Sequence, residues 1–506
     1  MRRTLVSLLS VLAFACGRGT DKPVTAGTDA TSDAAQAFRL EQPKAAKPKD
    51  FVGPVPTRTV LPSGLTVMVI EKHELPLVAV HLVVRSGTSA DTKGHEGIAQ
   101  MVANMLQSGT TTRKASDIDE AIETLGTQIS SSTDLDGSAA FVQVLRDNLP
   151  QAFDVLADVI QNPTFPADEL ERVRAQMTTN LLQERDSPPR LASRTLLQTI
   201  YGDHPYGRSA AVTPDGLAKV KRDELKAFHA KHYRPGNAAI IIVGDITSDE
   251  ATKLVESRFG GWKGSDTPPP IGPVAARKPG IILVPKAGAA QAQILAGHVG
   301  VPRSDPDFYA LVLANLVLGG QFNSRINMNL REQKGFTYGA SSAFNYGRGP
   351  GAFFVATSTR PEVAAPAIHE ILLEIRKIRQ SGVTEQELEG AKSNYIESLP
   401  GEFDTVRSLA RMVGTIYMYD LPLDYYGAIG AKLREVSIDH VAKAVKDHID
   451  DDKLEIVVVG DEGQLKAQLE ALGQSDMSRP VEVRPPPAID KKPQPGKPGA
   501  AGNPAR

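Results

Sequence analysis

The residues whose spacing could support chemistry lie in residues 97–110, GIAQMVANMLQSGT. Apolar residues recur there three and four places apart, which predicts a helix with one buried face that ends near Gly109. Gln100 and Asn104 would share one face of this helix, with Ala103 between them. Two imidazoles at the outer positions could bind one zinc ion, and a carboxylate at the middle position could activate a zinc-bound water. This chain has two amides and a methyl group there, and amides are poor zinc ligands.

The residues around these positions form a wider pattern. On the expected helix it consists of Gly97, Ile98, Ala99, Met105, Leu106, Gly109 and Thr110. It continues in HPYGRSAAVTPDGLAKV at residues 204–220, FHAKHYRPGNAAIIIVGD at 228–245 and LREQKGFTYG at 330–339. Together these stretches resemble the pitrilysin/insulinase family of zinc peptidases, whose motif helix typically reads G-L-A-H-F-L-E-H-M-L-x-x-G-T. The resemblance covers roughly residues 52 to 470 and implies the fold of that family.

The same resemblance gives a position for the third zinc ligand. In the family it is a Glu at the end of an E-R-x-x-V-x-x-E pattern on a later helix, and the corresponding run here is VRAQMTTN, with Asn180 at the ligand position. The expected ligands and the base are thus all replaced, at Gln100, Ala103, Asn104 and Asn180. His95 and Glu96 precede the helix, but His95 is five residues from Gln100 and would lie on a different face. The sequence predicts no catalytic residue and no metal site in this chain.

A second family feature is retained in the later part of the chain. Arg331 and Tyr338 have the R-x6-Y spacing, preceded by the family-like run FNSR at residues 322–325. In the family this pair faces the zinc helix across a chamber, binds the substrate backbone and stabilises the oxyanion. Both groups are fixed donors, and the loss of one such donor costs roughly 100- to 1000-fold in rate in other enzymes. The alternative is structural: Arg331 pairs with a surface carboxylate and Tyr338 packs at the start of a strand.

The local patterns predict both strands and helices. Strands are expected within residues 64–88 and, around an Asp136-Gly137 turn, within residues 127–145. Helices are expected at residues 115–125, with Ser116 as N-cap, and at 152–161 and 167–185.

An internal repeat extends this pattern to the whole chain. AAIIIVGD ends at Asp245 and LEIVVVGD ends at Asp461, with similar helical segments before each. We therefore predict an α+β fold of two related halves, each an antiparallel β-sheet covered by helices. The resemblance implies that the halves form a clam shell around a chamber, with residues 126–137 resembling the edge strand that docks peptides. A solvent-facing strand explains that run almost as well.

The composition predicts domain boundaries along the chain. Residues 17–51 are poor in large apolar residues and read as a disordered tether. The N-terminal peptidase-like domain is expected at 52–264 and the C-terminal one, with the Arg/Tyr pair, at 281–473. A Pro-rich linker at 265–280 joins them, and a Pro-rich tail at 474–506 is expected to be disordered.

The first sixteen residues, MRRTLVSLLSVLAFAC, predict a targeting segment whose apolar run is too short to span a membrane. Signal peptidase could cut after Ala15. Alternatively Cys16, the only cysteine, would be the acylated first residue of a bacterial lipoprotein, although Ala13 stands where Leu is usual. The placement of the sole cysteine favours the lipoprotein. The expected location is the cell envelope, on the periplasmic side or the surface, with the membrane contacted through the lipid.

The composition and motifs leave a short choice of functions. A formal net charge of −2 gives no indication of a nucleic-acid partner. The resemblance implies a non-catalytic, substrate-clamping subunit of a heterodimeric zinc peptidase, whose H-x-x-E-H partner carries the zinc while this chain binds no cofactor and contacts the peptide substrate. The alternative is a peptide-binding or scaffold lipoprotein without peptidase activity. The replaced ligand positions argue against a third possibility, an active single-chain peptidase with unusual ligands.

Overall fold

The computed structural model describes residues 51–265, 268 and 270–486. These residues belong to the unit that spans residues 50–506. The targeting segment, Cys16 and most of the expected tether and tail lie outside the described residues.

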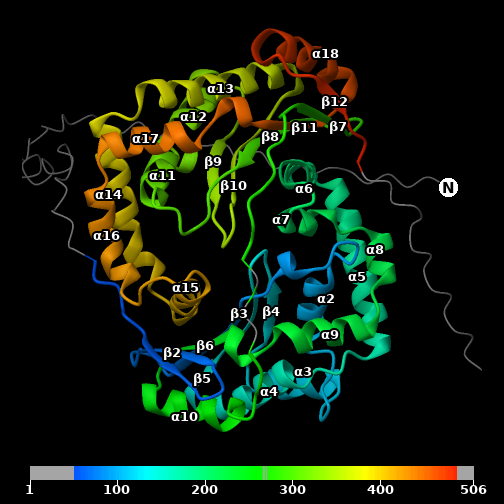
Figure 1. Cartoon of the computed structure of the whole chain (residues 1–506), viewed down its shortest axis with the longest axis vertical. Helices are drawn as coiled ribbons and strands as arrows, with labels where there is room; N and C mark the ends of the chain where they lie inside the picture. The colour runs from blue at the N-terminus through cyan, green and yellow to red at the C-terminus, as the bar shows by residue number, and fades with distance from the viewer. Residues whose placement is uncertain (1–50, 266–267, 269, 487–506) are drawn as a thin grey trace, which may run out of the picture. The chain divides into compact units, whose positions relative to one another are not determined.

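The first half of the chain builds a six-stranded sheet, here called sheet 1 (Figure 1). The strand order is β1-β2-β6-β3-β5-β4. The strands are β1 Thr57–Val60, β2 Thr66–Glu71, β3 Leu77–Val84, β4 Ser130–Thr133, β5 Ser138–Leu145 and β6 Ala238–Gly244. Neighbours run antiparallel except β2 and β6, which are parallel. The β-branched run of β6 is buried along its whole length because the sheet is covered on both faces.

The second half builds sheet 2, in the order β12-β7-β11-β8-β10-β9. The strands are β7 Ile281–Pro285, β8 Ala292–Val299, β9 Ala340–Asn345, β10 Ala352–Thr359, β11 Glu455–Gly460 and β12 Val481–Val483. From β7 to β9 the order repeats that of sheet 1 from β2 to β4, with a parallel pair at the same place. The predicted α+β fold of two related, largely antiparallel halves is confirmed.

Each half contributes a set of helices, most of which pack around its own sheet. Those of the first half are α2 Ile98–Met105, α3 Ala115–Thr124, α4 Leu149–Gln161, α5 Ala167–Asp186, α6 Pro188–Tyr201, α7 Pro205–Arg208, α8 Pro214–Lys219, α9 Arg222–His232 and α10 Ser248–Phe259. Those of the second half are α11 Phe308–Asn315, α12 Arg325–Asn327, α13 Ala364–Ser381, α14 Glu385–Glu402, α15 Val406–Met418, α16 Tyr425–Glu435, α17 Ile438–His448 and α18 Glu462–Leu472.

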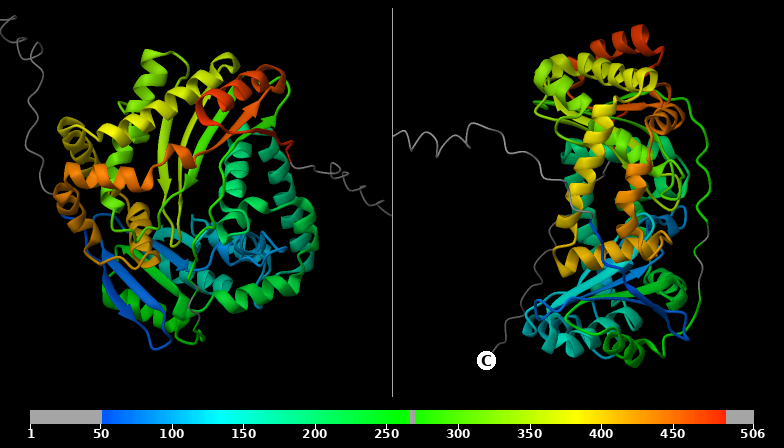
Figure 2. Two further views of the ribbon diagram at one scale, coloured as in Figure 1. Left: turned by 45° about the horizontal axis from the view of Figure 1, so that its top comes forward. Right: turned by 90° about the vertical axis from the view of Figure 1, so that its left-hand side faces the viewer.

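The halves exchange one helix each across their inner faces. Helix α6 of the first half packs on β8 and β11 of sheet 2, and α15 of the second half packs on β3 and β6 of sheet 1 (Figure 1). Their apolar side chains complete the core of the opposite half. The expected linker runs between the halves as an extended segment without helix or strand over residues 270–280 (Figure 2).

Two local expectations were wrong. Helix α2 ends at Met105 rather than near Gly109, and Gly109 instead forms a β-bridge with Lys114. Ser116 is not the N-cap of α3, because the helix begins at Ala115 and its N-cap residue is Lys114. There the carboxylate of Asp117 accepts a hydrogen bond from the backbone N–H of Lys114 at 3.0 Å and satisfies a free donor of the first turn.

Order extends beyond the expected domain at both ends. Phe51, assigned to the tether, packs against Phe403 with ring centroids 4.7 Å apart and the rings tilted. In the expected tail, residues 481–483 form β12, which pairs in parallel with β7. Val481 and Val483 alternate with Glu482 there, so the segment can satisfy the free backbone edge of β7 and pack against its apolar face. Among the described residues, no helix has the length and apolarity needed to cross a bilayer.

Candidate functional site

Helix α2 carries the first group of predicted site residues. It packs against β4, α5 and α9, and its buried face includes the predicted apolar residues and Ala103, which is 1% exposed. Gln100 and Asn104 lie on the other side, where Gln100 Nε2 donates a hydrogen bond to Asn104 Oδ1 at 2.9 Å. The two amides therefore satisfy each other along one helical turn.

Asn180 repeats this arrangement on α5. Its Oδ1 accepts a hydrogen bond from Gln176 Nε2 at 2.9 Å, again across one helical turn. Helices α2 and α5 are in contact, so two exposed amide pairs occupy the helices that would carry zinc ligands. Neither pair titrates near neutral pH, so these residues can donate and accept hydrogen bonds but cannot act as a general base.

The two ionisable residues before α2 are engaged elsewhere. His95 Nδ1 lies 2.7 Å from Glu224 Oε1 on α9, and Glu96 Oε1 accepts a hydrogen bond from the backbone N–H of Gly94 at 2.8 Å. In the part of the chain that the structure describes, neither side chain bonds to Gln100 or Asn104.

A buried carboxylate that the sequence analysis missed starts α2. Asp91 accepts hydrogen bonds from the backbone N–H groups of Gly97 at 2.7 Å and Ala99 at 2.8 Å. Burial raises the pKa of Asp91 to about 7, against the lowering effect of those two bonds. Asp91 caps the helix although a loop separates it from the first helical residue. A capping residue is normally sought directly before the helix, so this cap does not show in the sequence.

The Arg/Tyr pair lies before β9. Arg331 belongs to a π-helical turn, Met328–Gln333, where Nε lies 3.2 Å from Glu332 Oε1 and the guanidinium lies 4.7 Å from the Phe322 ring centroid. Tyr338 is 91% exposed. The arginine therefore has a neighbouring carboxylate, as in the structural alternative, whereas the tyrosine does not pack at the strand start.

The residues around this pair fix its loops. Asn327 Nδ2 donates to the carbonyl of Phe322 at 2.6 Å, and Asn327 Oδ1 accepts from the N–H of Ala340 at 3.0 Å. Arg325, in the family-like run, forms an ion pair with Glu387 at 2.6 Å, so it anchors α12 to α14. Within the described ranges, no hydrogen bond or ion pair joins Arg331 or Tyr338 to the amides of α2 and α5.

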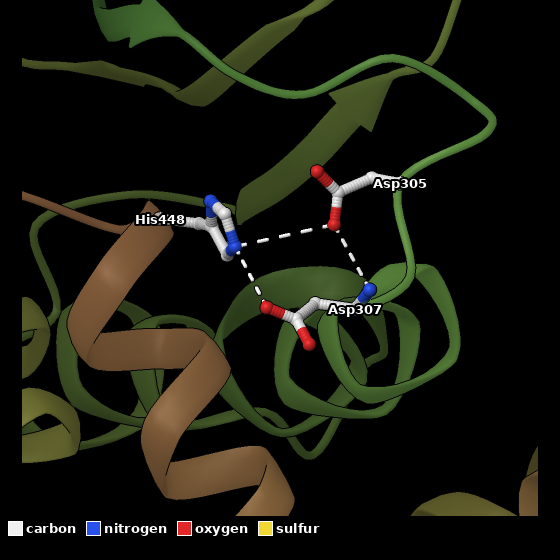
Figure 3. A group of neighbouring side chains, drawn as sticks. All are labelled: Asp305, Asp307 and His448. Carbon is white, nitrogen blue, oxygen red and sulfur yellow. Dashed lines mark hydrogen bonds and ion pairs between the residues drawn. The ribbon is translucent and has the colours of Figure 1, made fainter.

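One further cluster has the residue types of a metal site (Figure 3). His448 Nε2 lies 2.9 Å from Asp307 Oδ2, and Asp305 Oδ1 accepts from the Asp307 N–H at 2.9 Å. The other oxygen of Asp307 lies 2.9 Å from His440 Nε2. Burial would raise the pKa of Asp307, but the two imidazole hydrogen bonds outweigh it and lower that pKa. The cluster is accounted for as a clamp between α17 and the start of α11.

The edge strand expected to dock peptides is present. Residues 130–133 form β4, which pairs with β5, and α2 lies beside it; no other strand of the described residues pairs with its second edge. Its turn is closed by Asp134, whose Oδ1 accepts from the N–H groups of Asp136 and Gly137.

Known proteins with similar sequences and structures agree with this architecture. Residues 66–214 match the family described as insulinase (peptidase family M16), and residues 219–395 match the peptidase M16 inactive domain. An uncharacterized zinc protease of Mycobacterium leprae is 28% identical over 340 residues, which are 67% of this chain and 76% of that protein. A Helicobacter pylori protein named non-peptidase homolog YmxG is 23% identical over 391 residues, 77% of this chain and 90% of that protein.

A solved structure gives the same result at the level of the fold. The crystal structure of a peptidase M16 inactive domain from Pseudomonas fluorescens has a TM-score of 0.76 at 28% identity, covering 80% of this chain and 98% of that one. Both family matches fall in the order that the motifs indicated. The chain belongs to the insulinase (M16) family of peptidases, as a non-catalytic M16-like protein.

Proposed function

We propose that this chain is the non-catalytic, substrate-clamping subunit of a heterodimeric M16-type zinc peptidase whose partner carries H-x-x-E-H and the zinc. The observation that carries the proposal is the pair of amide ladders on α2 and α5, Gln100–Asn104 and Gln176–Asn180, within an otherwise preserved family fold. Members of this family often work as pairs of homologous subunits, so a chain without the metal residues still has a role beside one that retains them.

Arg331 and Tyr338 are the donors that this chain would contribute. Tyr338 is almost fully exposed, and among the described residues its hydroxyl has no hydrogen-bond partner. The Arg331 pair with Glu332 is a surface pair, and such pairs contribute only about 0–1 kcal/mol. Redirecting both groups to a substrate carbonyl or its oxyanion would therefore cost little.

The proposal includes attachment to the cell envelope through Cys16. The sole cysteine follows a short apolar run at the expected distance from the N-terminus, and a tether-like composition follows it. Mass spectrometry of the mature N-terminus would find an acylated Cys16. An unmodified terminus at Cys16, as left by cleavage after Ala15, would overturn the lipid anchor.

The first test is a pull-down of the tagged chain from detergent-solubilised envelope. Near-stoichiometric recovery of an H-x-x-E-H chain is expected. Recovery of this chain alone, or with unrelated envelope proteins, would favour a peptide-binding or scaffold lipoprotein instead.

The second test measures peptide turnover by the assembled pair. Arg331→Ala and Tyr338→Phe should each lower turnover roughly 100- to 1000-fold. Arg258→Ala is a matched control, because its side chain is 42% exposed and paired with Asp154, while that of Arg331 is 40% exposed and paired with Glu332. Unchanged turnover in both site variants would make Arg331 and Tyr338 structural residues.

A further inference from the structure

A cavity of about 380 Å³ with mixed polar and apolar walls lies between α15 and the β4–β5 part of sheet 1. We call it the α15 pocket and define it by His81, Ser130, Ser132 and Phe141 on the sheet and Arg407 and Arg411 on the helix. It is on the face of the sheet opposite α2. Part of the expected peptide-docking run 126–137 lines it, whereas the replaced ligand positions and the Arg/Tyr pair do not.

The strand register explains which side chains reach this pocket. Ser130 pairs with Phe141, which pairs with His81, and residues opposite each other across strands point to the same face. Ser131 pairs with Ala140, which belongs to the core on the α2 side. Successive residues of β4 therefore point alternately to the α15 pocket and to α2.

Helix α15 packs on β3 and β6, and its side chains line the pocket together with those of β4. Near its start, the Arg407 guanidinium lies 4.0 Å from the Phe141 ring centroid, next to Ser130. Near its end, Met418 is so close to the β4–β5 turn that a Cβ at Gly137 would lie 2.3 Å from Met418 Cε. Arg411, one helical turn after Arg407, thus faces the middle of the strand.

The two arginines have no acidic partner among the described residues. Like charges four residues apart on a helix repel each other, so this pair favours a bound anion. The carboxylate of Asp134 lines one end of the pocket, but its Oδ1 accepts from the backbone of the β4–β5 turn. Ser130 and Ser132 add hydroxyl donors on the opposite wall.

We propose that the α15 pocket binds carboxylates of an extended peptide that adds to the open edge of β4. A peptide strand paired with β4 would alternate in the same way, so every second side chain would enter the pocket. Side chains two residues apart on a strand are separated by about 6.6 Å, and residues four apart on a helix by about 6 Å along its axis. The spacing of Arg407 and Arg411 therefore fits an acidic-x-acidic motif.

This inference deepens the proposed function, because it rests on the chain binding peptides, but it does not depend on the zinc-bearing partner. The test uses the full chain alone in detergent and fluorescence anisotropy of short labelled peptides with amidated C-termini. The peptides differ only in a central Glu-Val-Glu or Gln-Val-Gln. The wild type should bind the Glu peptide about tenfold more tightly, and this preference should weaken at high salt.

Variants locate the preference. Arg407→Gln and Arg411→Gln should each reduce it, and the double variant should abolish it. Arg190→Gln on α6 is the control: this exposed arginine is 3.8 Å from Glu184 and should leave the preference intact. Both site arginines are exposed, so the variants should fold, which circular dichroism checks.

Three results would overturn the inference: equal affinity for both peptides in the wild type, a preference that survives in the double variant, or no peptide binding at all. A Gln-Val-Gln peptide with a free C-terminus that binds tightly to the wild type only would support the pocket, with the terminal carboxylate as the source. Each of these results is independent of the turnover effect of Arg331 and Tyr338 in the assembled pair, which tests the proposed function separately.

Discussion

The two exchanged helices occupy equivalent places and differ in what lies beneath them. Under α6, an apolar cluster fills the interface with sheet 2, including Leu196, Ile200, Leu295 and Val457. Under α15, apolar packing on sheet 1 gives way near the β4 edge to the α15 pocket. One exchange is an apolar contact, whereas the other borders a cavity beside a strand edge that no described strand pairs with.

The same contrast holds for their charges. Each helix carries two arginines four residues apart. On α6, Arg194 lies 3.7 Å from Glu184 and donates to the carbonyl of Val212, and Arg190 pairs with the same glutamate. On α15, no carboxylate in the described part of the chain pairs with Arg407 or Arg411. The arginines of α6 are therefore paired within the protein, whereas those of α15 are exposed to solvent and are free to contact the proposed acidic peptide.

The close contacts are reversed as well. At the α6 interface the glycine is on the strand: a Cβ at Gly297 would lie 3.0 Å from Leu196 Cδ2. At the α15 interface the glycine is on the helix: a Cβ at Gly414 would lie 3.0 Å from Cε1 of His81, whose Nδ1 donates to the Ala410 carbonyl at 3.2 Å. The strand-borne histidine leaves a polar wall that the leucine-filled interface lacks.

The largest expected effect on stability comes from a substitution in the apolar interface between α6 and sheet 2. Leu196→Ala removes a fully buried side chain from the apolar cluster and should lower the free energy of unfolding by about 2–5 kcal/mol. Urea denaturation measures this loss. The preference for acidic peptides should persist in the folded variant, and its disappearance would mean that the two interfaces are not separable in function.

The next comparison truncates one arginine on each helix. Arg194→Ala leaves the Val212 carbonyl without this donor, in a place where the arginine is largely buried, and should cost about 1–3 kcal/mol. Arg411→Ala breaks no ion pair and relieves a repulsion of about 0.2–0.5 kcal/mol, so its stability should stay the same or rise slightly. A large loss of stability in Arg411→Ala would show that Arg411 has a structural role, as on α6.

Much of the fold was accessible from the sequence, because it follows from local periodicity. The buried face of α2, the β4–β5 turn at Asp136-Gly137 and the repeated strands ending before Asp245 and Asp461 all follow from short patterns. The exchange of α6 and α15 does not. Their amphipathic patterns say that one face is buried but not which sheet covers it.

The candidate site divides in the same way. Family spacing identified the amide positions on α2 and α5, where the structure shows paired amides. The α15 pocket joins residues as distant in sequence as His81 and Arg411, so no motif could show it. The cap by Asp91 was missed because a loop separates it from the helix that it starts.

Acidification should test the polar wall of the α15 interface. Burial lowers the pKa of His81, so the unfolded chain binds a proton more readily than the folded one. The contribution of His81 to stability is therefore present above about pH 6.5 and is lost as the pH falls below that value. His229 and His298, whose pKa burial lowers to about 4, add to the same slope. Since these histidines also contribute, the wild type and His81→Gln must be compared. The free energy of unfolding should depend less on pH in His81→Gln than in the wild type. Identical slopes would show that His81 is not held neutral by burial.

A glycine substitution on α15, with a small expected effect on stability, gives the sharpest test of the contrast. Gly414→Ala gains about 1 kcal/mol of helix propensity on α15, but its new methyl group meets the His81 ring at 3.0 Å, so the two effects nearly cancel. The methyl group enters the α15 pocket, because Gly414 is one of its lining residues. Stability measured by urea denaturation should therefore change by less than about 1 kcal/mol while binding of the Glu-Val-Glu peptide weakens.

The matched change at the other interface is Gly297→Ala. Its new methyl group meets the Leu196 side chain and the backbone of β10 in the apolar contact, so it should lower stability without changing the peptide preference. If both alanines lowered stability equally and neither altered binding, the two exchanged helices would be equivalent structural contacts and the α15 pocket would have no ligand.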